Sequence, residues 1–388
     1  MDFSEDSEHE AIRTAVREIC AQFPDEYWAE ADAAHAFPWA FYQEMARGGW
    51  IGIAIRAEYG GGGAGISEAA IVLEEVAASG ACMNGASAIH MSIFGMHPVV
   101  RHGSDRLKQR YLPPVARGDL HVAFGVTEPD AGLDTTAIST RAVREGDGYR
   151  VTGRKVWTSK ALESDRVLLL TRTTPAAECA RRTDGLTLFV ASLKDPAVGV
   201  RAIPKMGRNA VASCEVTYDG LFVPESDRVG AEGHGFRYLL DGLNAERVLI
   251  AAEALGIGRA AIRRAVGYAG RRVVFGRPIG ANQGIAFPLA EAYARLAAAS
   301  LAVQQAAWRV DHGLPAGEHA NTAKFLAAEA GFAAADAAVQ THGGFGYASE
   351  YHVERYWREA RLMKIAPVPQ EMVLNYLAEH VLGLPRSY

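Results

Sequence analysis

The stretch that decides the fold is residues 121–159, HVAFGVTEPDAGLDTTAISTRAVREGDGYRVTGRKVWTS. Its TEPDAG run is rich in residues that break regular structure, and we expect backbone N–H and C=O groups there to stay free for a ligand. The remainder predicts a hairpin whose last strand carries Trp157 and Ser159. Residues two apart on a strand share a face, so an indole and a hydroxyl point the same way. This pair suits a flat heteroaromatic ligand that needs polar contacts at its ring edge.

Either part alone is also typical of a surface loop and a plain hairpin. Together they resemble the flavin-binding segment of the acyl-CoA dehydrogenase family, whose usual form is TEPxAGSD followed by Trp-x-Thr or Trp-x-Ser. Four more segments resemble the family in the same order along the chain: 1–20, 48–65, 271–283 (RRVVFGRPIGANQ) and 340–347 (QTHGGFGY). Five collinear matches favour family membership over chance similarity.

Composition narrows the class of protein. The chain has 388 residues with 49% hydrophobic and 22% charged side chains, which is ordinary for a globular protein of two or three domains. Its net charge of −5 gives no basic surface for nucleic acid. The four cysteines are widely spaced, so we expect neither a metal site nor disulfides, and a cytoplasmic location. The acidic N-terminus is unlike a secretory signal.

The pattern of apolar residues changes twice along the chain. Residues 8–120 have helical spacing, 121–225 consist of short apolar runs separated by Asp, Gly and Pro, and the rest returns to Ala-rich helical spacing. Residues 76–100 lack charged side chains but contain polar residues and a proline, so we expect buried helix there and no membrane span. The resemblance implies an α+β fold: an N-terminal helical domain (1–120), a middle β-barrel-like domain (121–228) and a C-terminal four-helix bundle (229–388).

The resemblance also implies FAD as cofactor. On the ring side it implies that Phe124, Val126 and Thr127 meet the ring edge, that Trp157 packs near the ring and that Ser159 hydrogen-bonds near flavin N5. The positions that match the family's pyrophosphate and adenine contacts are Arg272, Phe275, Gln283, Gln340, Gly343 and Gly344. In the family several of these contacts cross a subunit boundary, which implies a homotetramer.

The usual catalytic base of the family is missing. Most members carry a glutamate twenty residues after the aromatic that corresponds to Tyr347, and here this position is Pro367. In the family the backbone N–H of the same residue helps to polarise the thioester carbonyl, and proline has no N–H. Losing one such donor costs about 3 kcal/mol of transition-state stabilisation.

A minority of the family, of the isovaleryl-CoA dehydrogenase type, holds the base on a helix just before an arginine. That position is Glu246, followed by Arg247. A Glu-Arg pair on a helix is also commonly a solvated ion pair. Glu253 lies seven residues later on the same helix face, about 10 Å away by helix rise, so both cannot reach one α-carbon. Glu371 is a third acid; the motif favours Glu246.

Two further positions bear on the substrate. Leu133 stands where many members have a serine near the CoA pantetheine, and Arg247 adjoins the expected base. His90 falls in a region that the family places beside the acyl pocket, but we expect it to be a core histidine with satisfied hydrogen bonds.

The leading interpretation is an acyl-CoA dehydrogenase that passes electrons to an electron-transfer flavoprotein. The alternatives are a desulfinase-like enzyme, an oxidase or a monooxygenase on the same fold, or a catalytically silent flavin or acyl-CoA binding protein.

Overall fold

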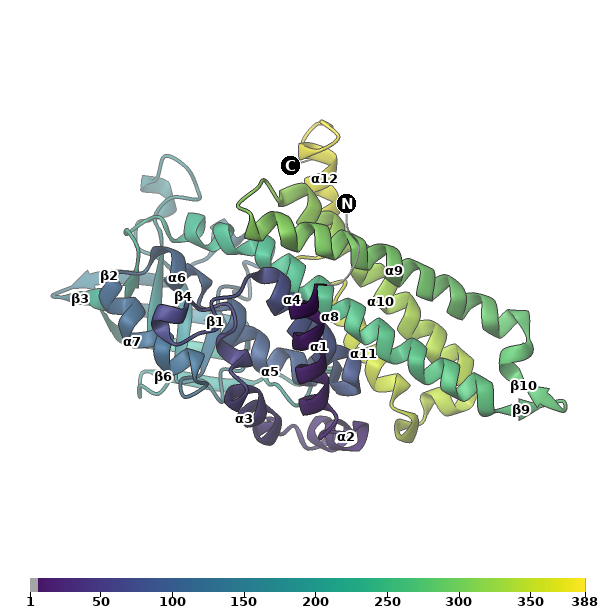
Figure 1. The fold of residues 1–388 in the computed structure, drawn as a ribbon. Coiled ribbons are helices and arrows are strands. Elements are labelled where there is room, and N and C mark those ends of the chain that lie inside the picture. Colours follow the sequence, from purple (N-terminus) through teal and green to yellow (C-terminus); the bar gives the residue numbers. More distant parts are fainter. Residues whose placement is uncertain (1–5, 388) are drawn as a thin grey trace.

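The computed structural model describes residues 6–387, so the first five residues of the N-terminal resemblance lie outside it. The molecule is elongated, with a β-sheet unit at one end, a group of short helices beside it, and long helices that extend to the other end (Figure 1). This helix–sheet–helix order confirms the predicted three-part architecture.

The N-terminal part consists of helices joined by short turns. Its helices are α1 (Ser7–Cys20), α2 (Asp25–Ala34), α3 (Trp39–Arg47), α4 (Ile66–Val76), α5 (Cys82–Phe94), α6 (His97–His102) and α7 (Asp105–Ala116). The charge-free segment 76–100 contains a π-helical turn, Ala77–Ala81, followed by α5, and both are almost wholly buried. The prediction of buried helix is therefore confirmed. No helix within residues 6–387 is long and apolar enough to cross a membrane.

The middle part is one eight-stranded sheet. Its strands are β1 (Val122–Gly125), β2 (Arg141–Glu145), β3 (Gly148–Ser159), β4 (Arg166–Arg172), β5 (Leu186–Ser192), β6 (Val198–Ala202), β7 (Ser213–Pro224) and β8 (Arg228–Val229). The strand order is β6-β7-β3-β2-β4-β5-β8, and β1 pairs with β4 in parallel. Alternate side chains of β4 and β5 enter two separate apolar clusters, so both faces of these strands are covered.

The C-terminal part is built on three long helices. They are α8 (Gly235–Arg271), α9 (Gln283–Asp311) and α10 (Gly317–His342), with the hairpin β9 (Val273–Val274) and β10 (Arg277–Pro278) between the first two. Two shorter helices, α11 (Val353–Leu362) and α12 (Gln370–His380), complete it.

Small residues let α8 pack closely on both sides. A Cβ atom at Gly256 would lie 2.4 Å from the Glu74 carbonyl oxygen of α4, and one at Gly331 of α10 would lie 2.4 Å from the Ala254 carbonyl oxygen. Neither contact tolerates a side chain, so α8 is fixed between the N-terminal helices and α10. It carries both Glu246 and Glu253 in that fixed position.

Candidate active site

The TEPDAG turn is anchored from within by Glu128. Its carboxylate accepts hydrogen bonds from the backbone N–H groups of Ser139 (2.7 Å) and Thr140 (2.9 Å) and from Lys155 Nζ (2.8 Å). Glu128 and Lys155 are both buried. Burial acts to raise the pKa of Glu128, but the Lys155 ammonium and these hydrogen bonds lower it to about 2. The buried ion pair therefore ties the turn to β3.

The expectation that backbone N–H and C=O groups of this turn stay free was wrong at Thr127, Glu128 and Ala131. The carbonyl of Val126 accepts from Lys155 Nζ at 2.9 Å, and that of Thr127 accepts from the Val156 N–H at 2.9 Å. Glu128 and Ala131 bond to each other through both backbone groups. The spacing of residues in the sequence could not show that β3 lies alongside the turn and donates hydrogen bonds to these carbonyl groups. The hydroxyl of Thr127 makes no hydrogen bond within residues 6–387 and remains available.

A bulge in β3 presents the predicted indole. The pairing with β7 shifts register between Lys155 and Thr158, and Trp157 adopts φ 60°. The Trp157 side chain is 56% exposed, while Thr158 is buried and Ser159 half-buried. Thr158 is buried between them, but the φ of 60° at Trp157 interrupts the regular alternation of the strand, so the common face of Trp157 and Ser159 stays a prediction. The bulge itself had no signal in the sequence.

Phe124 and Ser159 lie at the junction of the sheet with the N-terminal helices. The ring of Phe124, at the end of β1, is 5.6 Å from the ring of Phe94 in α5. Ser159 Oγ accepts a hydrogen bond of 3.0 Å from the guanidinium of Arg208, in the loop between β6 and β7. Arg208 was not among the predicted site residues, because a single arginine in a loop has no distinguishing spacing.

The two acids of α8 have different surroundings. Glu246 is 9% exposed, and its carboxylate makes no hydrogen bond or ion pair within the described residues 6–387. Burial raises the pKa of Glu246 to about 7; the nearby Glu253 adds to this rise, while His90 and Arg247 oppose it. A buried carboxyl group with a pKa near neutrality is suited to general-base chemistry.

Glu253, by contrast, is engaged. It is fully buried, and its Oε1 lies 2.8 Å from His90 Nδ1 of α5. Burial acts to lower the pKa of His90, but the Glu253 carboxylate outweighs this and raises it. The prediction that His90 is a core histidine with a satisfied hydrogen bond is confirmed, and its partner is one of the candidate bases.

The remaining acid and substrate positions lie as follows. Glu371 is exposed in the first turn of α12, and Pro367 is exposed in the turn before it. Arg247 is half-buried and donates to Asn244 Oδ1 at 3.1 Å. Leu133 is 64% exposed in the loop after TEPDAG. The structure thus leaves Glu246 as the buried acid without a partner among the three that the sequence offered.

The positions expected on the adenine side lie at the far end of α8. Arg272, Gln340, Gly343 and Gly344 line one open groove of about 570 Å³. A Cβ atom at Gly343 or Gly344 would meet nothing within 4 Å, so the backbone there is accessible. Arg272 has no carboxylate partner within residues 6–387. An unpaired guanidinium beside an open glycine turn fits a pyrophosphate.

Two expected contacts lie outside this groove. Phe275 is 100% exposed at the tip of the β9–β10 hairpin, and Gln283 is exposed at the start of α9. The chain alone does not bring them to the other four residues. Glu246 and Arg272 are separated by about 39 Å along α8, at 1.5 Å per residue, and Figure 1 places the hairpin far from the sheet. The two halves of the expected cofactor site therefore lie apart in one chain, in keeping with the contacts across a subunit boundary that the resemblance implies.

Comparisons with known proteins cover nearly the whole chain. Three family models match in succession: acyl-CoA dehydrogenase N-terminal domain (residues 6–119), middle domain (123–221) and C-terminal domain (233–382). An acyl-CoA dehydrogenase of Mycobacterium tuberculosis is 39% identical, covering 100% of this chain and 99% of its own.

Solved structures give the same picture. A glutaryl-CoA dehydrogenase in complex with glutaryl-CoA superposes with a TM-score of 0.95 at 29% identity, covering 100% of this chain and 98% of its own. The prolyl acyl carrier protein oxidase AnaB superposes with a TM-score of 0.92 at 26% identity, covering 98% of this chain and 100% of its own.

Proposed function

The chain belongs to the FAD-dependent acyl-CoA dehydrogenase family, and from that premise we propose that it removes the α and β hydrogens of an acyl-CoA with Glu246 as base. One observation carries the choice of base. Glu246 is buried without a partner among the described residues and has a pKa near 7, whereas Glu253 is paired with His90. A base must be free to take a proton, and Glu246 meets that requirement.

The residues that would hold the cofactor fall into two sets. Thr127, Trp157 and Ser159 serve the flavin ring, and Arg272, Gln340, Gly343 and Gly344 serve the pyrophosphate and adenine of a second FAD. When bound, FAD supplies the acceptor for the hydride that leaves the β-carbon. The chain itself supplies the group that takes the α-proton, Glu246, and a dry setting that raises its basicity.

Anaerobic mixing with a panel of acyl-CoAs tests the function. We expect at least one of them to bleach the flavin absorbance, with a rate at limiting substrate that rises with pH through about 7 and then levels off. The sign follows from Glu246, whose carboxylate is the active form and predominates above its pKa of about 7. The rate of flavin bleaching is measured by stopped-flow absorbance from about pH 5.5 to about pH 9. A flavin that no acyl-CoA bleaches would contradict the function, and a flat profile would contradict the choice of base.

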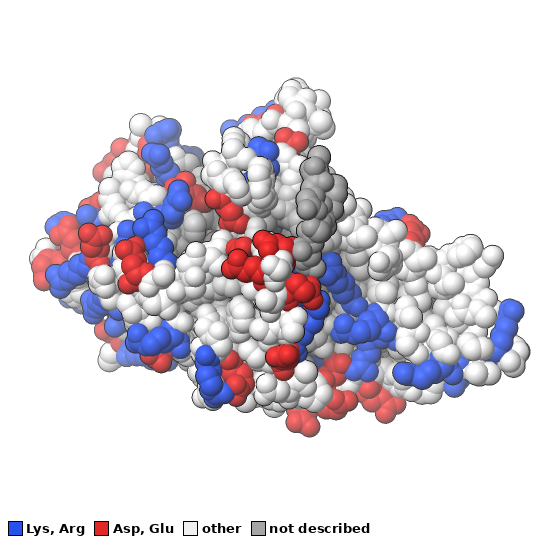
Figure 2. All heavy atoms as spheres, in the orientation of Figure 1, with Lys and Arg blue, Asp and Glu red and all other residues white. Residues whose placement is uncertain are grey.

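We also propose that the active protein is a homotetramer. Along α9, apolar side chains that are half or more exposed recur about every seven residues: Phe287 (61%), Tyr293 (67%), Leu301 (55%) and Trp308 (50%). Figure 2 shows that much of the surface at the end of the molecule with the long helices, away from the sheet, has neither acidic nor basic side chains. An exposed apolar stripe of this length is typical of a subunit interface.

This assembly predicts a joint outcome. We expect the purified protein to contain FAD, to run as a tetramer in light scattering, and to lose both properties together on dilution, because the adenine-side groove completes the site of a neighbouring subunit. A monomer with fully bound flavin would contradict the assembly. Released FMN in place of FAD would contradict the assignment of Arg272 and Gln340.

The electron acceptor and location are also proposals. An electron-transfer flavoprotein is the acceptor that the family resemblance implies. All four cysteines are free, and a cytoplasmic location stays a prediction.

One observation favours a second candidate, an oxidase on the same fold. Pro367 provides no N–H at the position where the family polarises the thioester carbonyl, and the structurally similar AnaB is an oxidase. The rate of flavin re-oxidation in air distinguishes the two. The flavin of a dehydrogenase, once reduced by acyl-CoA, re-oxidises slowly in air and rapidly with an electron-transfer flavoprotein. An oxidase re-oxidises rapidly with oxygen alone.

A further inference from the structure

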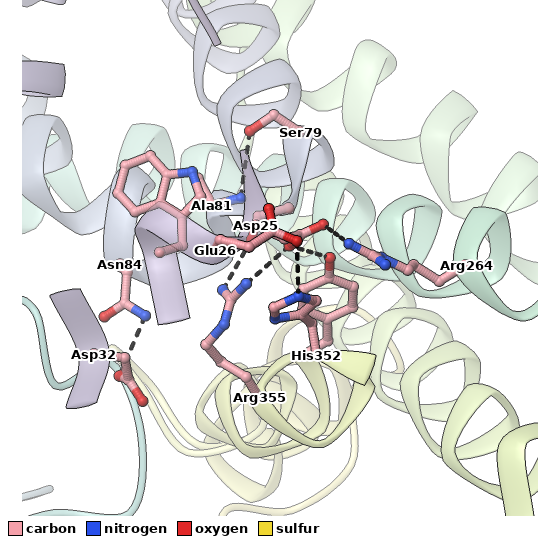
Figure 3. A network of polar contacts seen from close by, with 12 residues as sticks. Asp25, Glu26, Asp32, Ser79, Ala81, Asn84, Arg264, His352 and Arg355 are labelled. Atoms are coloured by element: carbon pink, nitrogen blue, oxygen red, sulfur yellow. Dashed lines mark hydrogen bonds and ion pairs between the residues drawn. The ribbon is translucent and has the colours of Figure 1, made fainter. Parts of the chain in front are cut away.

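The loop between β6 and β7 is held by the N-terminal helices at the two residues after Arg208. The Asn209 N–H donates to Asp32 Oδ1 at 2.7 Å, and the Ala210 N–H donates to Asn84 Oδ1 at 2.9 Å. Asn84 Nδ2 in turn donates to Asp32 Oδ1 at 3.2 Å, and the close-up shows these two side chains facing each other (Figure 3). The loop backbone is therefore attached at two adjacent positions to a buried polar network.

This attachment accompanies an unusual backbone at Arg208. The residue has φ 57°, in the left-handed region that non-glycine residues seldom adopt. An arginine in that conformation requires support from its surroundings, and the two anchored residues that follow provide it. The consequence is a guanidinium directed from the loop toward the end of β3.

Serine hydroxyls from three elements receive this guanidinium. Nη2 donates to Ser159 Oγ of β3 at 3.0 Å and to Ser213 Oγ of β7 at 2.6 Å, and Nη1 lies 3.4 Å from Ser87 Oγ of α5. No carboxylate lies within ion-pair distance of Arg208 in the part of the chain that the structure describes. The nearby Glu253 is itself paired with His90. Arg208 is thus a cation fixed by neutral acceptors.

Hydrogen-bond chemistry then dictates the orientation of the Ser159 hydroxyl. Arginine can only donate, so Ser159 Oγ must be the acceptor, and its own hydrogen has to point away from Arg208. From this geometry we propose that Arg208 is a positioning residue, which turns Ser159 into a hydrogen-bond donor toward the flavin and places a positive charge behind it. The proposal rests on the placement of Ser159 beside flavin N5 in the proposed function.

The expected effect is on the reduction potential. Uptake of a hydride, two electrons and one proton, adds negative charge to the flavin, and the fixed positive charge of Arg208 favours that state. Replacing Arg208 with glutamine removes the charge and allows the Ser159 hydrogen to turn back toward the new side-chain oxygen. The equilibrium of the bound flavin then shifts toward the oxidised form, which lowers its reduction potential.

The test measures the reduction potential of FAD bound to the full-length protein, with a reference dye and no acyl-CoA. For Arg208→Gln we expect the equilibrium to shift at least tenfold toward oxidised flavin, which is about 30 mV for a two-electron couple. Arg208→Lys keeps the charge and should recover part of the shift. Ser159→Ala removes the hydroxyl that links Arg208 to the flavin and should also change the potential. The matched control is Arg154→Gln. Arg154 lies on β3, the strand that carries Ser159, and pairs with Glu215 at the surface.

An Arg208→Gln protein with full FAD content and the potential of the control would overturn the proposal. If that variant loses its FAD, Ser159→Ala decides, and a wild-type potential in Ser159→Ala would overturn the proposal. Because no substrate is present, these outcomes are independent of whether acyl-CoA bleaches the flavin. A wild-type protein without bleaching would contradict the proposed function and leave the potential shift measurable.

Discussion

Replacing Glu246 with glutamine is expected to slow flavin reduction by acyl-CoA by about 10²–10⁴-fold, the range typical for loss of a general base. Glutamine keeps the size of the side chain and removes its ability to take the α-proton. Because Glu246 makes no hydrogen bond or ion pair within residues 6–387, the substitution breaks no contact there, and FAD content should not change. Rapid mixing under anaerobic conditions gives the rate, and released flavin gives the cofactor content.

Two variants serve as controls for Glu246→Gln. Glu371→Gln alters an exposed acid and should leave the rate within about twofold of wild type, a change of under 0.5 kcal/mol. Glu253→Gln removes the partner of His90 and should affect stability more than the chemical step, since Glu253 lies about 10 Å further along the helix. A wild-type rate in Glu246→Gln would contradict its assignment as the base, and a larger loss in Glu253→Gln would transfer the role to Glu253.

The second large effect is expected at Glu128. Glu128→Gln leaves the buried Lys155 ammonium without its charge partner, and breaking a buried ion pair from one side costs about 3–5 kcal/mol of unfolding free energy. The TEPDAG turn loses its attachment to β3 in the same step, so we expect weaker FAD binding. Urea denaturation followed by circular dichroism measures the stability. Glu145→Gln, which breaks an exposed and solvent-screened pair with Arg150, should leave the stability close to that of wild type.

The difference in unfolding free energy between wild type and Glu128→Gln should depend on pH. The pKa of Glu128 is lowered from 4.5 to about 2 in the folded protein, so its contribution is complete above pH 4.5 and is lost as the pH falls from 4.5 toward 2. The stability gap between wild type and Glu128→Gln should therefore narrow over that interval. A gap that is constant from pH 7 to pH 3, or a loss no larger than that of Glu145→Gln, would show that the ion pair does not anchor the turn.

Much of the fold followed from local patterns. Helical spacing, short apolar runs and Ala-rich helices are properties of neighbouring residues, and they predicted the helix–sheet–helix order and the buried character of α5. The common face predicted for Trp157 and Ser159 assumed a regular strand, and the bulge in β3 at Trp157 was not predictable from their spacing.

What the patterns could not supply was contact between distant segments. His90 and Glu253 are 163 positions apart, and their pairing distinguishes two acids that share one helix face. Arg208 and Ser159 are 49 positions apart, and the anchor of the Arg208 loop comes from residues of α2 and α5. The hydrogen bond from Lys155 to the carbonyl of Val126 could not be predicted either, because the sequence around Lys155 is that of an ordinary surface hairpin.

The most direct measurement of the central claim is a structure of the FAD-loaded protein with a bound acyl-CoA or an unreactive thioether analogue. The proposed function predicts one oxygen of Glu246 within proton-transfer reach of the α-carbon, on the side opposite flavin N5, with Glu253 still bound to His90. A Glu246 carboxylate turned away from the α-carbon, or Glu253 in its place, would contradict it.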